Sequence, residues 1–205
     1  MKNNAFQLSG DVSYSFSDYF KLNNEVEDIV AFFGYDFDKQ SYLLPQSTVV
    51  LDRLEDLILR LNENLLYASM NSEIARREFL IAPVISEIIH YTHSKVKIEY
   101  PLSVSEHLKG YLDYLLQQQQ HLLVIEAKKA DIEQGFLQLA VELIALDKWL
   151  EQDTVLLYGA VSTGDIWRFG VLNRQTKMIV QDVNLFRVPA DVEDLLRVVI
   201  GILGE

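Results

Sequence analysis

Apolar residues recur along the chain with two spacings, which predict alternating helices and strands. An apolar residue at every third or fourth position, or a capping residue before an apolar run, is typical of a helix and marks four segments: residues 48–65, 71–91, 131–150 and 191–202. Runs that are apolar throughout, or that alternate with polar residues, are typical of strands and mark six more: residues 95–102, 110–115, 122–128, 154–161, 166–171 and 178–180. This succession predicts an α/β fold with a mixed sheet flanked by helices.

The order of these elements predicts their topology. We expect a helix, three antiparallel strands, a crossover helix and then a parallel strand. Asp131 is placed to cap the crossover helix. After that helix, strand 154–161 would pair in parallel with strand 122–128, as in a βαβ unit.

Residues 110–128 are expected to form a β-hairpin whose tip is a run of four glutamines. If the hairpin is symmetric about Gln119 and Gln120, the last two of the four, Asp113 lies directly across from Glu126. Side chains alternate along a strand, so Glu126 and Lys128 share a face. Like charges that face each other across a ladder are destabilising. The pattern therefore predicts a cation between the two carboxylates.

Carboxylates are hard oxygen ligands suited to Mg²⁺ or Mn²⁺, which take one or two of them together with a substrate phosphate. Beside such a pair, Lys128 can orient a water or offset developing negative charge. The alternative is an ordinary hairpin with a surface aspartate and a surface Glu-x-Lys pair. The apolar run before Glu126 favours the metal site, because a charge at the end of a buried strand needs a compensating partner.

The helix expected over residues 71–91 carries three acids. At about 100° per residue, Glu78 falls within roughly 40° of the centre of the apolar stripe, whereas Glu73 and Glu87 fall more than about 90° away. Glu78 is thus expected to point toward the sheet, the alternative being a glutamate that extends from the helix edge into solvent. Pro83 should kink or restart this helix.

The first seventy residues differ in character from the rest. Residues 1–45 are aromatic-rich and irregular, apart from a short helix expected over 25–33. They are either an arm that binds a partner or stacks on DNA, or a cap over one end of the core. The helix 48–65 is either a packing helix or a homodimer face. We therefore expect an N-terminal extension, residues 1–70, on a domain of residues 71–205.

Composition places the chain among globular soluble proteins, with 49% hydrophobic and 23% charged residues. The absence of cysteine excludes disulfides and thiolate zinc sites. No signal peptide and no apolar run of about 18 residues is found, which predicts a cytoplasmic protein that does not enter a membrane.

The net charge of −12 is unfavourable for DNA binding, which depends on phosphate contacts. Residues 1–75 carry 12 acids against 5 basic residues and residues 130–205 carry 12 against 6, but residues 76–129 carry 6 against 7. Six cations of that middle segment could form a local basic rim: Arg76, Arg77, Lys95, Lys97, Lys109 and Lys129. We expect DNA binding to be weak or to require a partner protein.

The chain resembles the PD-(D/E)xK nuclease superfamily, which has the restriction-endonuclease-like fold, in three motifs: Gly110-x-x-Asp113-Tyr114, Val124-Ile125-Glu126-Ala127-Lys128-Lys129 and Gln138. With Arg77 and Leu80-Ile81-Ala82-Pro83 before them, the layout is similar to the nuclease domain of type I restriction motor subunits and of small relatives. The resemblance covers roughly residues 73–180. Leu112 stands where the family name has proline, a position that varies in the superfamily.

The resemblance implies an αβββαβ core with a helical or irregular N-terminal extension, and a Mg²⁺- or Mn²⁺-dependent endonuclease that hydrolyses DNA phosphodiester bonds. Asp113 and Glu126 would be metal ligands, Glu78 an auxiliary ligand and Lys128 the residue that positions the attacking water. Gln138 would lie near the scissile phosphate; without the resemblance it belongs to a solvated helix side. The alternative is a catalytically silent relative that acts as a binding or assembly module, which the net charge favours.

Overall fold

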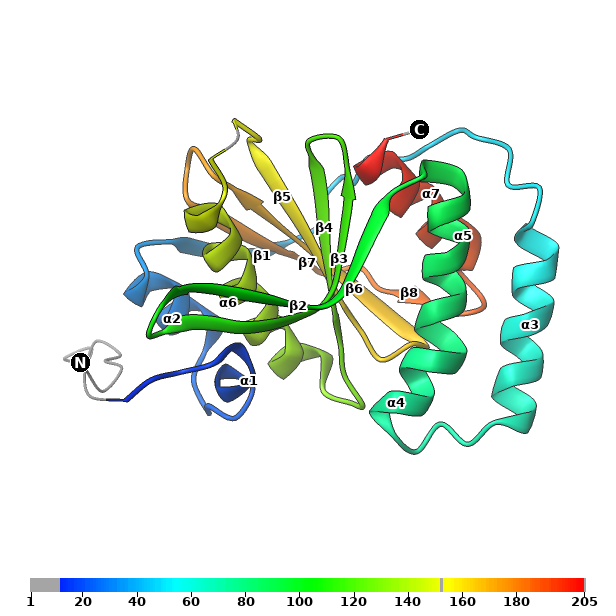
Figure 1. The fold of residues 1–205 in the computed structure, drawn as a ribbon, viewed down its shortest axis with the longest axis horizontal. Coiled ribbons are helices and arrows are strands. Elements are labelled where there is room, and N and C mark those ends of the chain that lie inside the picture. The colour runs from blue at the N-terminus through cyan, green and yellow to red at the C-terminus, as the bar shows by residue number, and fades with distance from the viewer. Residues whose placement is uncertain (1–11, 152, 205) are drawn as a thin grey trace.

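The computed structural model of the chain describes residues 12–151 and 153–204. Its strands form one mixed sheet in the order β1-β7-β6-β5-β4-β3-β2, with β8 paired to β6 (Figure 1). The pairs β4–β5 and β1–β7 are parallel, and the other neighbours are antiparallel. The strands are β1 (Asp36–Gln40), β2 (Lys95–Ser105), β3 (Leu108–Gln118), β4 (His121–Ala127), β5 (Leu156–Ser162), β6 (Ile166–Asn173), β7 (Met178–Asp182) and β8 (Phe186–Arg187).

Helices cover both faces of the sheet (Figure 1). One hydrophobic core joins α1, α2 and α6 to the sheet, and a second joins α3, α5 and α7 to its other face. The helical segments are α1 (Phe16–Tyr19), α2 (Val26–Phe32), α3 (Leu54–Tyr67), α4 (Glu73–Arg76), the π-helical turn η1 (Arg77–Ile81), α5 (Ala82–Thr92), α6 (Ile132–Trp149) and α7 (Val192–Leu203). In the described part of the chain, no helix has both the length and the apolar character needed to cross a membrane.

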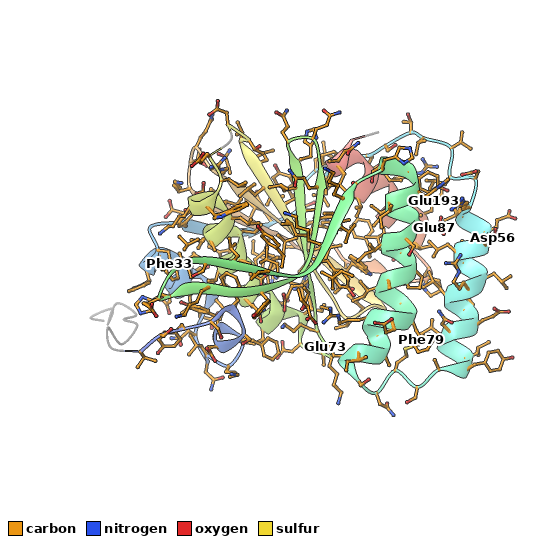
Figure 2. The ribbon with its side chains drawn as sticks, viewed as in Figure 1. Phe33, Asp56, Glu73, Phe79, Glu87 and Glu193 are labelled. Carbon is orange, nitrogen blue, oxygen red and sulfur yellow. The ribbon has the colours of Figure 1, made fainter. Side chains whose placement is uncertain are left out.

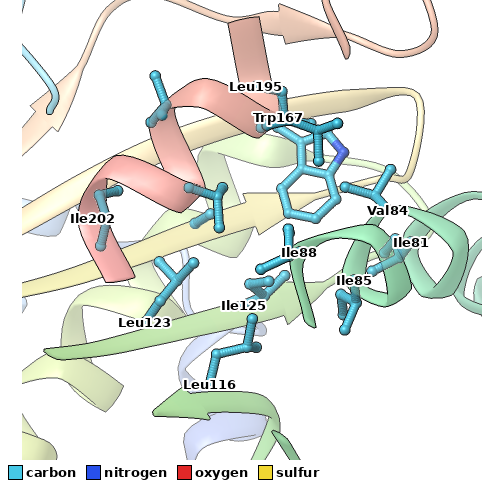
Figure 3. Close-up of a cluster of buried hydrophobic side chains, with 14 of the residues drawn as sticks. Ile81, Val84, Ile85, Ile88, Leu116, Leu123, Ile125, Trp167, Leu195 and Ile202 are labelled. Atoms are coloured by element: carbon cyan, nitrogen blue, oxygen red, sulfur yellow. The ribbon is translucent and has the colours of Figure 1, made fainter. Parts of the chain in front are cut away.

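The core beneath α5 and α7 is shown in Figure 3, where Trp167 of β6 lies between the two helices. Its buried side chains include Ile81, Val84, Ile85, Ile88, Leu116, Leu123, Ile125, Trp167, Leu195 and Ile202. Burying one such side chain contributes roughly 1.5–3 kcal/mol. These contacts fix α5 and α7 against strands β3, β4 and β6.

The predicted α/β class and element order are confirmed. After α5, the strands β2, β3 and β4 are antiparallel, α6 crosses over, and β5 returns parallel to β4. Asp131 caps α6 as expected, because its Oδ1 accepts a hydrogen bond from the backbone N–H of Gln134 at 3.0 Å. The crossover places the buried face of α6 over β5 and the neighbouring β4.

The N-terminal segment contains a strand that the sequence analysis did not predict. β1 extends the sheet by pairing in parallel with β7, so the prediction of a purely helical or irregular extension was wrong for residues 36–40. α2 forms where a helix was expected over residues 25–33. Phe16 and Tyr19 are buried against the core, as the cap interpretation predicts. Residues 1–11 lie outside the described residues.

The helix predicted over residues 48–65 begins later, at Leu54. The residues before it are extended and pack against α7, where the N–H of Ser47 donates to the carbonyl of Arg197 at 2.9 Å. Gly201 permits this approach, because a Cβ there would lie 2.8 Å from the backbone nitrogen of Gln46. Tertiary packing with α7 therefore outweighs the local helical pattern at this point.

The helix predicted over residues 71–91 is interrupted by the π-helical turn η1. Pro83 accounts for the interruption, since it has no N–H to donate to the carbonyl of Phe79. That carbonyl instead accepts a hydrogen bond from the side-chain amide of Asn64 on α3, at 2.7 Å. The expected restart of the helix near Pro83 is thus observed, with α3 compensating the lost backbone bond.

Candidate active site

The β3–β4 hairpin has the predicted register. Tyr114 pairs with Ile125 and Gln118 with His121, which places the two-residue turn at Gln119 and Gln120. The ladder ends one step before Asp113 and Glu126. Instead, Oδ2 of Asp113 accepts a hydrogen bond from the backbone N–H of Ala127 at 2.8 Å. Asp113 is therefore fixed at the end of β4, where the sequence predicted a pair of carboxylates.

The β2–β3 ribbon changes direction beside Asp113. Glu99 of β2, across from Asp113, has a φ of 50°, and the pairing skips this position. Beyond it, Leu112 is fully buried while Tyr111 is 65% exposed. Simple alternation along the strand would put Tyr111 on the same face as Asp113, but the twist of the ribbon turns Tyr111 outward. Asp113 thus lies at the bend, with its side chain 18% exposed.

Glu126 is 2% exposed and lies under α6. Its Oε1 accepts hydrogen bonds from Nε2 of Gln138, at 2.8 Å, and from Nζ of Lys128. Its Oε2 has no hydrogen-bond partner among the residues that the structure describes. Leaving a buried carboxylate oxygen unpartnered is costly. A ligand, or the proton of a neutral Glu142, would satisfy this oxygen.

Lys128 lies on the same side of the sheet as Glu126, as predicted. Its Nζ also donates to Oε1 of Gln138 at 2.9 Å and lies 4.9 Å from the ring centroid of Phe20. A Cβ on Gly135 would come within 3.1 Å of the Lys128 side chain, so this glycine lets the stem pass under α6. The ammonium is therefore held by an acid, an amide and an aromatic ring.

α6 supplies two buried polar side chains one turn apart. Gln138, predicted near the site, bridges Lys128 and Glu126, and its Nε2 also donates to Oε1 of Glu142 at 2.8 Å. Glu142 was not predicted. It is fully buried, and its Oε2 lacks a hydrogen-bond partner within the described chain. Its signal in the sequence was an acid inside the apolar run 136–146. We call Asp113, Glu126, Lys128, Gln138 and Glu142 the buried polar cluster.

Burial dominates the electrostatics of the buried polar cluster. It raises the pKa of Glu126 to about 7; the charge of Asp113 adds to this rise, and Lys128 opposes it. Burial also raises the pKa of Glu142 well above its ordinary value, and the charge of Glu126 raises it further. Burial lowers the pKa of Lys128, but Glu126 more than offsets this, so the ammonium keeps its proton. The cluster therefore favours one neutral acid at Glu142 and a charged lysine.

Glu78 is exposed, which corrects the prediction that it points toward the sheet. The π-helical turn adds one residue to the helical repeat and rotates the preceding positions by about 100°. Ile74 of the predicted stripe is turned outward for the same reason. Glu87, predicted to face away, is 4% exposed and lies toward α3, with Oε1 3.6 Å from Arg60 (Figure 2). α5 packs against the sheet on one face and toward α3 on the other, so the face that carries Glu87 is also buried.

Across residues 12–151 and 153–204, no three His, Cys, Asp or Glu side chains stand close enough together to enclose a metal ion. Glu78 therefore does not complete a three-acid group with Asp113 and Glu126. The donor set still fits a hard divalent cation, because Asp113 and Glu126 each offer a carboxylate oxygen and that of Glu126 is buried without a partner.

Part of the expected basic rim is engaged in ion pairs. Arg76 contacts Asp165 at 2.6 Å, and Lys109 contacts Glu106 at 2.7 Å. Arg77 lies beside Asp113. The remaining cations of the rim, Lys95, Lys97 and Lys129, are exposed.

Comparisons with family models, with curated proteins and with solved structures find no significant match to the chain. The functional assignment therefore depends on the chemistry of the buried polar cluster.

Proposed function

We propose that the protein is a Mg²⁺- or Mn²⁺-dependent endonuclease of the PD-(D/E)xK type, which hydrolyses DNA phosphodiester bonds in the cytoplasm. The observation that carries the proposal is the buried Glu126 carboxylate, which keeps one oxygen unpartnered among the described residues while lying close to Asp113 and Lys128. Glu87 and Glu142 also keep an unpartnered oxygen, so the support lies in the position of Glu126 beside both Asp113 and Lys128. A cation bound between Asp113 and Glu126 would provide the missing partner for that oxygen.

Each member of the cluster has a role in this proposal. Asp113 and Glu126 would hold the cation, which polarises a phosphoryl oxygen and promotes ionisation of water. Lys128, held by Glu126 and Gln138, would orient the attacking water and offset charge on the phosphate. Gln138 fixes the positions of Glu126 and Lys128 through both ends of its amide. Glu142, neutral at its raised pKa, would leave Glu126 as the charged acid of the pair.

DNA is the proposed substrate, bound weakly. The exposed cations Lys95, Lys97 and Lys129 would contact the backbone, but the net charge of −12 works against many such contacts. A partner protein, or a second copy of the chain joined through α3, would supply further affinity.

A binding or assembly module without catalysis is the second candidate. The observation that favours it is the strongly acidic surface outside residues 76–129. In that case the charges of the buried polar cluster would only balance one another within the core, and divalent ions would not change the stability of the protein.

Asp113→Asn tests the proposal against this alternative. Asparagine can still accept a hydrogen bond from the N–H of Ala127 and is less repelled by Glu126. Without metal, the free energy of unfolding of the variant should therefore be higher than that of wild type or lie within about 1 kcal/mol of it. Wild type should gain stability with Mg²⁺ or Mn²⁺ by about RT ln(1 + [L]/Kd), and the variant much less. The variant should also lose metal-dependent cleavage of DNA.

Glu151→Gln is the matched control, because Glu151 is exposed beyond the far end of α6. It should behave as wild type in thermal melts and in the cleavage assay. A wild-type protein that neither cleaves DNA nor shifts its melting temperature at millimolar Mg²⁺ or Mn²⁺ would favour the binding module. A shift without cleavage would support the metal site and reject DNA as the substrate.

A further inference from the structure

Arg77 occupies the space beside the one carboxylate oxygen of Asp113 that the β3–β4 hairpin does not use. Oδ2 of Asp113 accepts the N–H of Ala127, while Oδ1 lies 3.6 Å from Nη1 of Arg77. The same Nη1 lies 3.6 Å from Oε1 of Glu99 on β2. Both distances exceed hydrogen-bond length, so the guanidinium sits between two acids without being locked to either.

The guanidinium is held instead by Tyr114. Nε of Arg77 donates to the Tyr114 hydroxyl at 3.3 Å, and its central carbon lies 5.2 Å from the centre of the ring. The Arg77 side chain is only 15% exposed. An aromatic ring gives a cation attraction without fixing its hydrogen bonds to a single acid. The contact with Tyr114 therefore holds the Arg77 guanidinium, whereas its longer contacts with Asp113 and Glu99 can be replaced by another cation.

Local structure directs Arg77 to this place. It is the first residue of η1, the π-helical turn imposed by Pro83 and stabilised by the bond from Asn64 to the Phe79 carbonyl. π-helical turns are rare and occur frequently at functional sites. A regular α-helix would rotate Arg77 by about 100° relative to α5.

Charge balance explains why a cation is needed there. Glu99, Asp113 and Glu126 come from three adjacent strands, and Lys128 already pairs with Glu126. Without Arg77, Asp113 would face Glu99 and Glu126 with no cation of its own. Such repulsion draws in any available positive charge.

We propose that Arg77 is a positioning residue that holds Asp113 ready for a divalent cation and gives up Oδ1 to that cation when it binds. The inference rests on the proposed function. Arg77 acts as a resident positive charge that competes with the metal, so it sets the metal concentration at which the site fills. It keeps the acids of three strands together while no metal is bound.

Mn²⁺ titration of the metal-free protein by calorimetry tests this role without any cleavage assay. Removing the competing charge in Arg77→Met should tighten Mn²⁺ binding, roughly two- to tenfold, while lowering the melting temperature of the metal-free protein. Arg77→Lys restores a cation and should return the Mn²⁺ affinity toward wild type. A merely structural arginine predicts the opposite, because a loosened site binds metal more weakly.

Arg76→Met is the matched control, because Arg76 is the neighbouring arginine and pairs with Asp165, away from Asp113. It should lose stability without changing Mn²⁺ affinity. Arg77→Gln, polar and of similar length, serves if the methionine variant does not fold. Wild type that binds Mn²⁺ with the same or higher affinity than Arg77→Met and Arg77→Gln overturns this inference alone. Wild type that binds no Mn²⁺ overturns the proposed function together with it.

Discussion

At the scale of single residues, two buried acids, Asp147 on α6 and Glu126 on β4, differ in how far their carboxylate oxygens are hydrogen-bonded. Asp147 accepts hydrogen bonds from Tyr35 at 2.6 Å, Arg174 at 2.7 Å and Lys177 at 2.5 Å. Glu126, in contrast, keeps one oxygen unpartnered in the part of the chain described. A fully satisfied buried acid stabilises the fold, whereas a buried acid with an unpartnered oxygen lowers its stability.

Asp147→Asn should therefore weaken the fold in a pH-dependent way. Burial raises the pKa of Asp147, but its bonds to Lys177, Tyr35 and Arg174 more than offset this, so its folded pKa lies below 3.8. The stabilising contribution is present above the unfolded pKa and is lost as pH falls through the folded value. Urea unfolding should show the variant about 2 kcal/mol less stable at pH 7. The difference should shrink below about pH 4; a difference that does not change with pH would assign the loss to packing.

Prediction from sequence succeeded at the residue scale where local geometry fixes a side chain. The two-residue hairpin turn sets the register, so the positions of Asp113, Glu126 and Lys128 followed from spacing. Glu142 could not be placed in the same way, because its burial depends on how α6 lies over β4. An acid inside an apolar helical run was the available signal.

At the scale of elements, the helix from α4 to α5 shows why periodicity alone misplaced Glu78. A stripe drawn at a constant angle assumes one continuous α-helix, whereas η1 shifts the phase before Pro83. The same turn brings Arg77 to Asp113. The sequence contained the proline, but the π-helical turn also depends on Asn64, which lies on another helix.

Asn64→Ala should test how far α3 stabilises this turn. Loss of the bond to the Phe79 carbonyl should lower the free energy of unfolding by about 1 kcal/mol. Asn62→Ala is the control, since the side-chain amide of Asn62 donates to the carbonyl of Ile58 within α3. Hydrogen exchange should show faster exchange around η1 in the Asn64 variant alone. Equal exchange in both variants would mean that Asn64 does not hold the turn.

At the scale of the whole molecule, the site lies where segments distant in sequence meet. The β3–β4 hairpin supplies Asp113, Glu126 and Lys128, α6 supplies the amide above them, and the N-terminal segment places Phe20 beside the lysine. The segment around α1 is tied to α6 by Gln134, whose amide donates to the carbonyl of Leu22 at 2.7 Å. The segment around α1 is thus part of the surroundings of the site, which sequence patterns alone did not indicate.

The central claim is that Asp113 and Glu126 together bind a divalent cation. The most direct measurement is an anomalous difference map from crystals of the protein soaked in Mn²⁺. We expect a peak in contact with carboxylate oxygens of both residues, with Arg77 displaced from Oδ1 of Asp113. A map without a peak there at saturating Mn²⁺, with the ion pairs of Glu126 and Asp113 unchanged, would contradict the account.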